Sequence, residues 1–228
     1  MRKTAKSACD AVRGSTFSRD HPAGDMLTYL CKPPPWANKI VTIAHNAKAF
    51  DLHFILNRAF ILKWKPELIM SGLKIMCMKM EHLFFLDSVS FLLCALRNLR
   101  EAFGLSASKS CYTHYFNTRE NINYVGPIPD KEYYGVDLMR EEEREEFLLW
   151  YESQRSETFD NRNVLESYSQ DDFTVIRQAS RVFRREFMLS GHIDVFVESI
   201  TIASACNNVL RKRFLKSDTI GLNPTGGY

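Results

Sequence analysis

An apolar run that leads directly into an amphipathic segment places the strongest constraint on how this chain folds. Residues 39–44 have the composition of a β-strand, and residues 50–63 carry apolar side chains at helical spacing. Asp51 therefore falls at a strand-to-helix junction, where α/β proteins commonly place a functional site. The purely structural interpretation is an Asn-centred turn followed by a carboxylate that stabilises a helix N-terminus.

The chain beyond this junction predicts a small sheet and then a series of helices. Three short apolar or alternating runs between residues 67 and 86, separated by two tight turns, indicate an antiparallel meander. Apolar residues at helical spacing then predict helices at about 90–103, 137–153, 164–189 and 196–215. We therefore expect an α/β fold whose C-terminal part is mostly helical.

The composition indicates a globular protein with a substantial core. Of the 228 residues, 45% are hydrophobic and 25% are charged. The cysteines form no C-x-x-C pair, so neither a zinc site nor a disulfide framework is indicated, and a reducing, intracellular compartment fits best. No window reaches the ~18 apolar residues of a membrane span, and we expect no membrane partner.

The charges are segregated along the chain more than the net charge of +3 suggests. Residues 137–160 are strongly acidic, whereas residues 1–19, 177–185 and 211–216 are basic. Basic clusters that are separate from an acidic face suit a polyanionic partner such as a nucleic acid. A solvated helix surface is an equal interpretation of each cluster taken singly.

One acidic residue interrupts the apolar face of the predicted helix at 164–189. Tyr168 and Asp172 are four residues apart, so both project from the same side of that helix. A carboxylate on a buried face needs a partner, commonly a cation or a metal. For this pair alone, a position of Asp172 at the solvent edge is the simpler interpretation.

Taken together, the segments resemble the proofreading 3′–5′ exonuclease domain of family B DNA polymerases, above all the protein-primed group that includes phage enzymes and Maverick/Polinton transposon polymerases. His45–Asp51 resembles the second exonuclease motif, Asn-x(2–3)-Phe/Tyr-Asp, and Tyr168–Asp172 resembles the third, Tyr-x-x-x-Asp. Ser88–Leu92 resembles the intervening Ser/Thr-Leu-x-x-hydrophobic motif that grips single-stranded DNA, with Val89 in place of leucine. The resemblance covers about residues 39–228.

This resemblance implies an RNase H-like fold, which is a mixed sheet flanked by helices, and a nuclease site. Two divalent metals, usually Mg²⁺, would hold the scissile phosphate. Asp51 and Asp172 would be metal ligands, and Tyr168 would orient the attacking water. The residues that would hold the 3′ end of single-stranded DNA are Asn46, Phe50, Ser88 and Val89, with Lys109 as a weaker candidate for phosphate contact.

Two departures from the family pattern limit what this chain is expected to do alone. The first exonuclease motif, Asp-x-Glu, should precede Asn46, but no acid there has a Glu two residues later. The polymerisation motifs are also missing. We therefore expect a catalytically inactive fragment of a protein-primed DNA polymerase. The longer enzyme would synthesise and proofread DNA in replication, with primer-template DNA and a terminal protein primer as partners.

The expected organisation has three parts. Residues 1–38 would form a poorly ordered or divergent segment, residues 39–190 the exonuclease domain without its first strand, and residues 191–228 a helical segment that leads toward a palm domain. Two other hypotheses stay open. One is a repurposed, non-catalytic module that binds DNA or another protein, and the other is a different RNase H-like nuclease that takes its missing acids from elsewhere.

Overall fold

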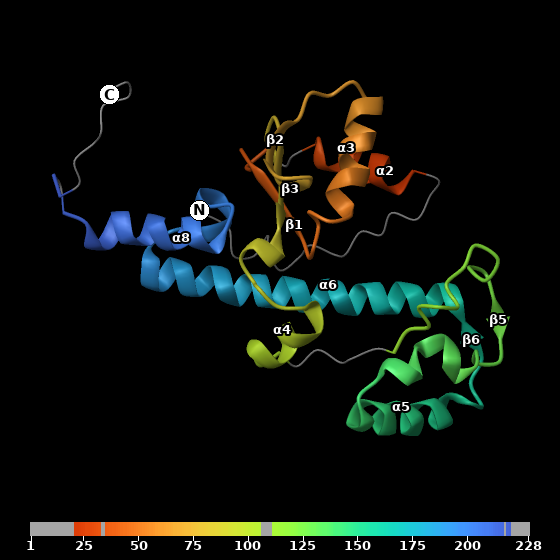
Figure 1. The fold of residues 1–228 in the computed structure, drawn as a ribbon. Helices are drawn as coiled ribbons and strands as arrows, with labels where there is room; N and C mark the ends of the chain where they lie inside the picture. The colour runs from red at the N-terminus through yellow and green to blue at the C-terminus, as the bar shows by residue number, and fades with distance from the viewer. Residues whose placement is uncertain (1–20, 33–34, 106–110, 217, 220–228) are drawn as a thin grey trace, which may run out of the picture. The chain divides into compact units, whose positions relative to one another are not determined.

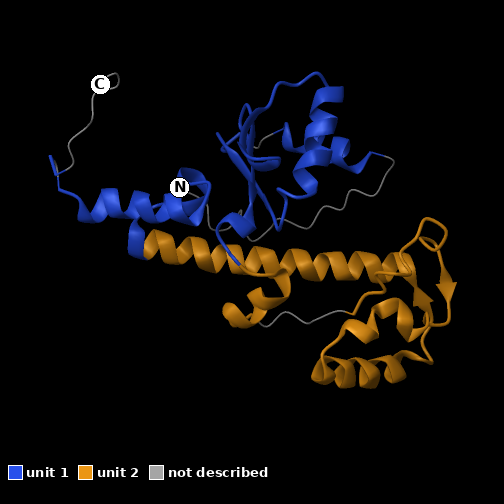
Figure 2. Cartoon of the chain, in the orientation of Figure 1, with its two compact units in different colours: residues 1–93, 190–228 blue, residues 94–189 orange. Residues whose placement is uncertain are grey.

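The computed structural model describes residues 21–32, 35–105, 111–216 and 218–219. The chain divides into two compact units (Figure 2). Unit 1 contains residues 1–93 and 190–228, and unit 2 contains residues 94–189. Each unit has its own hydrophobic core, and the helices and strands carry the labels of Figure 1.

A four-stranded mixed sheet forms the centre of unit 1. Its strands are β1 (Ile40–Ala44), β2 (Glu67–Ser71), β3 (Lys74–Met80) and β4 (Leu83–Asp87). The order across the sheet is β1-β4-β3-β2, with β1 parallel to β4 and the other pairs antiparallel. The strand predicted at 39–44 and the predicted meander are thereby confirmed.

The two turns of the meander need a backbone that most residues avoid. Gly72 has φ 59° between β2 and β3, and Glu81 has φ 51° between β3 and β4. Glycine adopts this left-handed conformation without steric cost, whereas Glu81 carries a Cβ penalty. The pairing of β2 with β3 shifts between Ile69 and Met70, so that Met76 is an extra residue on β3.

Two helices cover one face of this sheet (Figure 1). They are α2 (Pro22–Leu30) and α3 (Asp51–Ile61). On α3 the buried residues are Leu52, Ile55 and Ala59, which recur at helical spacing as the sequence predicts. They pack with Leu27 of α2 and with Phe85 of β4 in one cluster.

Helix α2 falls inside the segment 1–38, for which we expected poor order or divergence. Leu27 of this helix is 0% exposed and belongs to the core of unit 1. Sequence periodicity over nine residues is too short to reveal a helix that tertiary packing stabilises. Residues 1–20 of that segment lie outside the described residues.

The C-terminal residues of unit 1 pack back on its first 93 residues. Phe196 makes an edge-to-face contact with Phe91 at 5.1 Å, and Lys39 Nζ donates to the Val197 carbonyl at 3.1 Å. The single helix predicted at 196–215 is wrong, because the backbone is extended at Ser199 and Thr201. The helical segments there are α7 (Val195–Glu198), α8 (Ile202–Val209) and a π-helical turn, η5 (Leu210–Phe214).

Unit 2 is mostly helical. Its helices are α4 (Leu96–Ala102), α5 (Glu141–Gln154) and α6 (Asn161–Glu186), with short turns η2 (Lys131–Tyr134) and η3 (Val136–Leu138). A π-helical turn, η4 (Phe187–Gly191), follows α6 and ends in unit 1. Helix α4 packs along α6, and two-residue strands β5 (Val125–Gly126) and β6 (Phe159–Asp160) pair with each other. Tyr134, Phe147 and Tyr151 form a small aromatic core.

The fold class is α/β, with a mixed four-stranded sheet flanked by helices and a mostly helical chain after residue 93. The helix predicted at 90–103 is shorter than expected and begins at Leu96. A 3₁₀ turn, η1 (Ser88–Ser90), takes the place of its start, because Asp87 accepts a hydrogen bond from Val89 N. Among the described residues, no helix is long and apolar enough to cross a membrane.

Candidate functional site

The predicted DNA-binding segments of unit 1 leave the same edge of the sheet. Strands β1 and β4 are parallel neighbours, and Ala44 lies opposite Asp87 at their carboxyl ends. The turn 45–50 follows β1, and η1 follows β4. Because ligands of α/β proteins commonly bind at the carboxyl ends of parallel strands, this edge is the natural position for a site.

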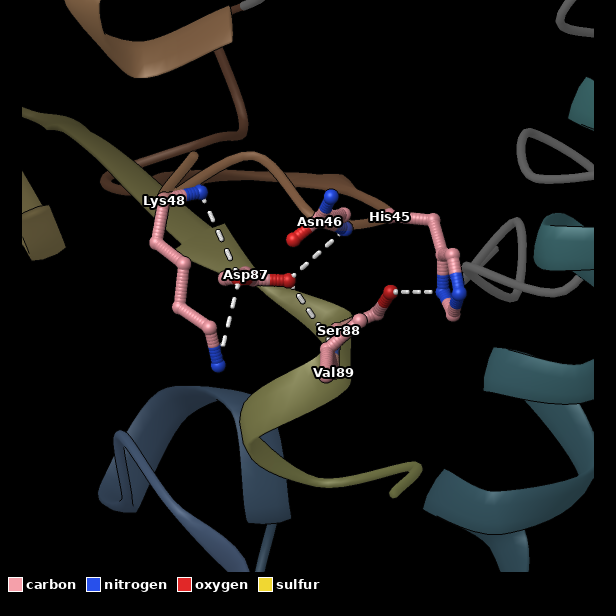
Figure 3. Close-up of polar contacts among 6 residues, drawn as sticks. All are labelled: His45, Asn46, Lys48, Asp87, Ser88 and Val89. Carbon is pink, nitrogen blue, oxygen red and sulfur yellow. Dashed lines mark hydrogen bonds and ion pairs between the residues drawn. The ribbon is translucent and has the colours of Figure 1, made fainter. Parts of the chain in front are cut away.

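A buried carboxylate joins the two segments (Figure 3). Asp87 is 0% exposed. Its Oδ1 accepts hydrogen bonds from Asn46 N at 3.0 Å and from Val89 N at 2.8 Å, and its Oδ2 accepts from Lys48 N at 3.3 Å. The Lys48 ammonium lies 3.6 Å from the same Oδ2. Asp87 thus connects the end of β4 with the turn that follows β1.

The DNA-binding motif expected from the sequence begins at Ser88, so its neighbour Asp87 was given no role. An ionised carboxylate that is fully removed from water is costly unless hydrogen bonds and an opposite charge compensate it. The three backbone donors and Lys48 supply that compensation. The sequence does contain a signal for this role: Asp87 is an acid at the end of an apolar strand, immediately before the predicted DNA-binding residues Ser88 and Val89.

The turn that Asp87 holds presents three of the predicted site residues to solvent. Asn46 has a left-handed backbone, with φ 61°, and its side chain is exposed. The next residue, Ala47, is buried in the hydrophobic core of unit 1 and so attaches the turn to that core. Phe50 is 62% exposed, and Asp51 is the exposed first residue of α3. An aromatic ring, an amide and a carboxylate are therefore available on one short segment.

Ser88 lies closer to the interior than its predicted contact with DNA implies. It is 0% exposed, and its hydroxyl makes a hydrogen bond with His45 Nδ1 at 2.9 Å (Figure 3). Val89 is half-buried. The structure thus brings Ser88 and Val89 to the same edge as Asn46, but it gives the Ser88 hydroxyl a protein partner.

An apolar pocket of about 320 Å³ opens beside Asp51. Helix α2 contributes Pro22, Ala23 and Met26, and the sheet contributes Phe85 among others. Asp51 is the charged residue of its lining. The pocket places the carboxylate next to an apolar wall that the sequence did not predict, because helix α2 was itself not expected.

The third predicted motif lies on α6 in unit 2. Tyr112 stacks on Tyr168 with ring centroids 5.1 Å apart, and His114 approaches Tyr168 edge-on at 5.5 Å. Burial raises the pKa of the Tyr168 phenol, and the Asp172 carboxylate adds to the rise through its charge and a hydrogen bond. Tyr168 and Asp172 therefore interact with each other, in agreement with their spacing on one side of the helix. Tyr112 and His114 also contact Tyr168, but the sequence did not single them out as site residues.

The predicted metal ligands are divided between the two units. Asp51 belongs to unit 1 and Asp172 to unit 2. Within the described residues, no three His, Cys, Asp or Glu side chains gather in a way that would hold a metal ion. The remaining candidate, Lys109, lies outside the described residues. The roles assigned to these side chains stay predictions.

Comparison with known proteins adds independent information on the chain. The family model described as DNA polymerase type B, organellar and viral, matches residues 37–227. A probable DNA polymerase of Podospora anserina is 25% identical over 138 residues, which are 60% of this chain and 11% of that protein. The chain thus spans about a tenth of the length of this curated relative. No solved structure matches it.

Proposed function

The chain belongs to the family of organellar and viral type B DNA polymerases, and we propose that it is the part of such an enzyme that carries the 3′–5′ exonuclease region, with an RNase H-like fold. In this proposal the chain binds the 3′ end of single-stranded DNA. The longer protein would replicate DNA from a terminal protein primer, as the resemblance to the protein-primed group suggests.

One observation carries the proposal. The Asn46–Asp51 segment and the Ser88–Val89 segment resemble the motifs that hold DNA in exonuclease domains. They meet at the carboxyl ends of two parallel strands, and Asp87 ties them together. Two motifs that are about forty residues apart in the sequence therefore lie at one edge of the sheet, where Asn46 and Phe50 are exposed. The exposed ring of Phe50 at that edge can stack on a base, which is the common way to bind single strands without reading their sequence.

The catalytic part of the proposal is limited by the available ligands. Asp51 and Asp172 would each offer a carboxylate to Mg²⁺, and Tyr168 would orient a water molecule. Since no group of three ligating side chains occurs in the described residues, these do not supply a complete two-metal site. We therefore expect the isolated chain to bind DNA without digesting it.

The test uses two phenylalanines that are both exposed near α3. Phe50 is 62% exposed and Phe60 is 59% exposed, so neither contributes much to the core. Phe50→Ala should weaken the binding of a fluorescent single-stranded oligonucleotide about five- to 150-fold, because stacking contributes about 1–3 kcal/mol per base. The measurement is fluorescence anisotropy at fixed salt concentration, since binding to phosphates depends on salt.

Phe60→Ala is the matched control, because it removes a ring of equal size and similar exposure from the other end of α3. Its affinity should equal that of the wild type. Equal losses in the two variants, or no binding by the wild type, would contradict the proposed DNA site.

A further inference from the structure

We propose that Asp87 is a positioning residue for the DNA-binding groups of unit 1: its carboxylate fixes the turn that presents Asn46 and Phe50, and it does not contact DNA or metal itself. This inference rests on the proposed function for the identity of the ligand. The anchoring of the turn by Asp87 can be tested without any ligand.

The acceptor sites of the Asp87 carboxylate are already occupied. A carboxylate offers about four lone-pair sites, two on each oxygen. Oδ1 accepts from the amides of Asn46 and Val89, and Oδ2 accepts from the amide of Lys48 and faces its ammonium. With the side chain 0% exposed, no acceptor site faces solvent. Asp87 therefore acts through the groups that it holds.

The turn that Asp87 anchors contains a residue in the left-handed region. Asn46 has φ 61°, a conformation that asparagine adopts more readily than most other non-glycine residues. Its own N–H is one of the donors to Asp87, so the carboxylate holds the residue with this backbone conformation directly. Loss of the carboxylate removes the hydrogen bond that selects this conformation and should therefore release Asn46 first.

Backbone hydrogen bonds within the turn connect the residues held by Asp87 to Phe50. Ala49 N donates to the Asn46 carbonyl at 3.0 Å, and Phe50 N donates to the Ala47 carbonyl at 3.2 Å. These bonds connect the residues held by Asp87 with the exposed aromatic ring. The same carboxylate holds Val89, so one group sets the position of both DNA-binding segments.

The first experiment is amide hydrogen exchange on the 228-residue chain. In the wild type, the amides of Asn46, Lys48 and Val89 should exchange as slowly as ladder amides of β4. Asp87→Asn replaces one carboxylate oxygen by an NH₂ group, which cannot accept a hydrogen bond from an N–H donor. The three amides should therefore exchange about ten- to hundredfold faster, while exchange of the β4 amides is unchanged. Exchange of these three amides at open-loop rates in the wild type would overturn the anchor even if the variant did not fold.

The second experiment measures oligonucleotide affinity in a double-mutant cycle of Asp87→Asn and Phe50→Ala. Each single variant should bind at least about fivefold more weakly than the wild type. If Asp87 acts by positioning Phe50, the double variant should lose little more than the larger single loss. A merely structural role would give independent, additive losses, and that result would overturn the proposal.

Glu198→Gln provides a matched control for the chemistry of the substitution. The Glu198 carboxylate also accepts from a backbone amide, that of Asp194, and pairs with a lysine, Lys212, but it lies on α7. This variant should bind DNA like the wild type. If the wild type binds and Asp87→Asn binds equally well, the inference fails while the proposed function stands. If the wild type does not bind, the proposed function fails, and hydrogen exchange alone decides on the anchor.

Discussion

At the scale of single residues, burial divides the groups of the site into two kinds. Asp87 and Ser88 are fully buried and have protein partners, whereas Asn46, Phe50 and Asp51 face solvent. A buried charge shapes the structure around it, and an exposed ring or carboxylate is free to meet a ligand. The residues that organise this site are thus different from those that would contact DNA.

Two neighbouring tyrosines are both buried, but their hydroxyls differ in hydrogen bonding. Tyr134 and Tyr151 belong to the aromatic core of unit 2. The Tyr151 hydroxyl donates to the Pro129 carbonyl at 3.1 Å, whereas the buried Tyr134 hydroxyl has no hydrogen-bond partner among the described residues. An unsatisfied buried hydroxyl costs about 1–3 kcal/mol. Tyr134→Phe should therefore leave the free energy of unfolding unchanged or raise it, as measured by urea denaturation.

Tyr151→Phe serves as the control, since it removes a hydrogen bond that is made. It should lower the free energy of unfolding by about 1 kcal/mol and leave the Pro129 carbonyl without this donor. A larger loss for Tyr134→Phe than for Tyr151→Phe would show that the Tyr134 hydroxyl has a partner.

The same burial makes the stability of unit 2 sensitive to alkaline pH. Burial raises the pKa of the Tyr134 phenol above its ordinary value, and the nearby Tyr151 adds to the rise. The folded state therefore keeps the proton that the unfolded chain releases near pH ~10. The contribution of the Tyr134 phenol to the free energy of unfolding is complete below pH ~10. It is lost as the pH rises toward the pKa of the phenol in the folded state. Tyr134→Phe should reduce the fall in stability above pH ~10.

At the scale of elements, the strands and helices around the site follow from local patterns. The strand at 39–44, the meander and α3 were predictable because apolar spacing and turn residues agree there. The break at Ser199–Thr201 was not, because Thr201 caps a new helix through Ser204 and competes with a continuous helical pattern. Helix α2 was missed because packing against α3, rather than its own sequence, stabilises it.

The importance of α2 for unit 1 can be tested at Leu27. This side chain is 0% exposed in the cluster that α2 and α3 form with the sheet. Leu27→Ala should lower the free energy of unfolding of unit 1 by about 2–5 kcal/mol, because it removes buried methyl groups and leaves a cavity. The loss is measured by thermal or urea unfolding.

Phe60→Ala is again suitable for comparison, because it truncates a larger side chain that is 59% exposed. It should change the stability by much less than Leu27→Ala. Similar stabilities of Leu27→Ala and the wild type would mean that α2 does not belong to the core of unit 1.

At the scale of the whole molecule, the predicted site is spread over both units. Asn46, Asp51 and Ser88 belong to unit 1, and Tyr168 and Asp172 belong to unit 2. The sequence could predict the type of these residues and their local pairs, since spacing along a helix or a strand determines which side chains are neighbours. It could not predict the tie through Asp87, because that tie depends on strand pairing between distant segments.

We propose that the chain binds single-stranded DNA through the sheet edge that Asp87 organises and that it does not cut this DNA. A gel-shift experiment tests both parts of this proposal. It uses the 228-residue chain with a 5′-labelled single-stranded oligonucleotide and Mg²⁺, followed by denaturing analysis of the same samples. We predict a retarded complex that contains full-length oligonucleotide and that weakens with added salt. Absence of a complex, or shortening from the 3′ end that Asp172→Ala abolishes, would contradict this proposal.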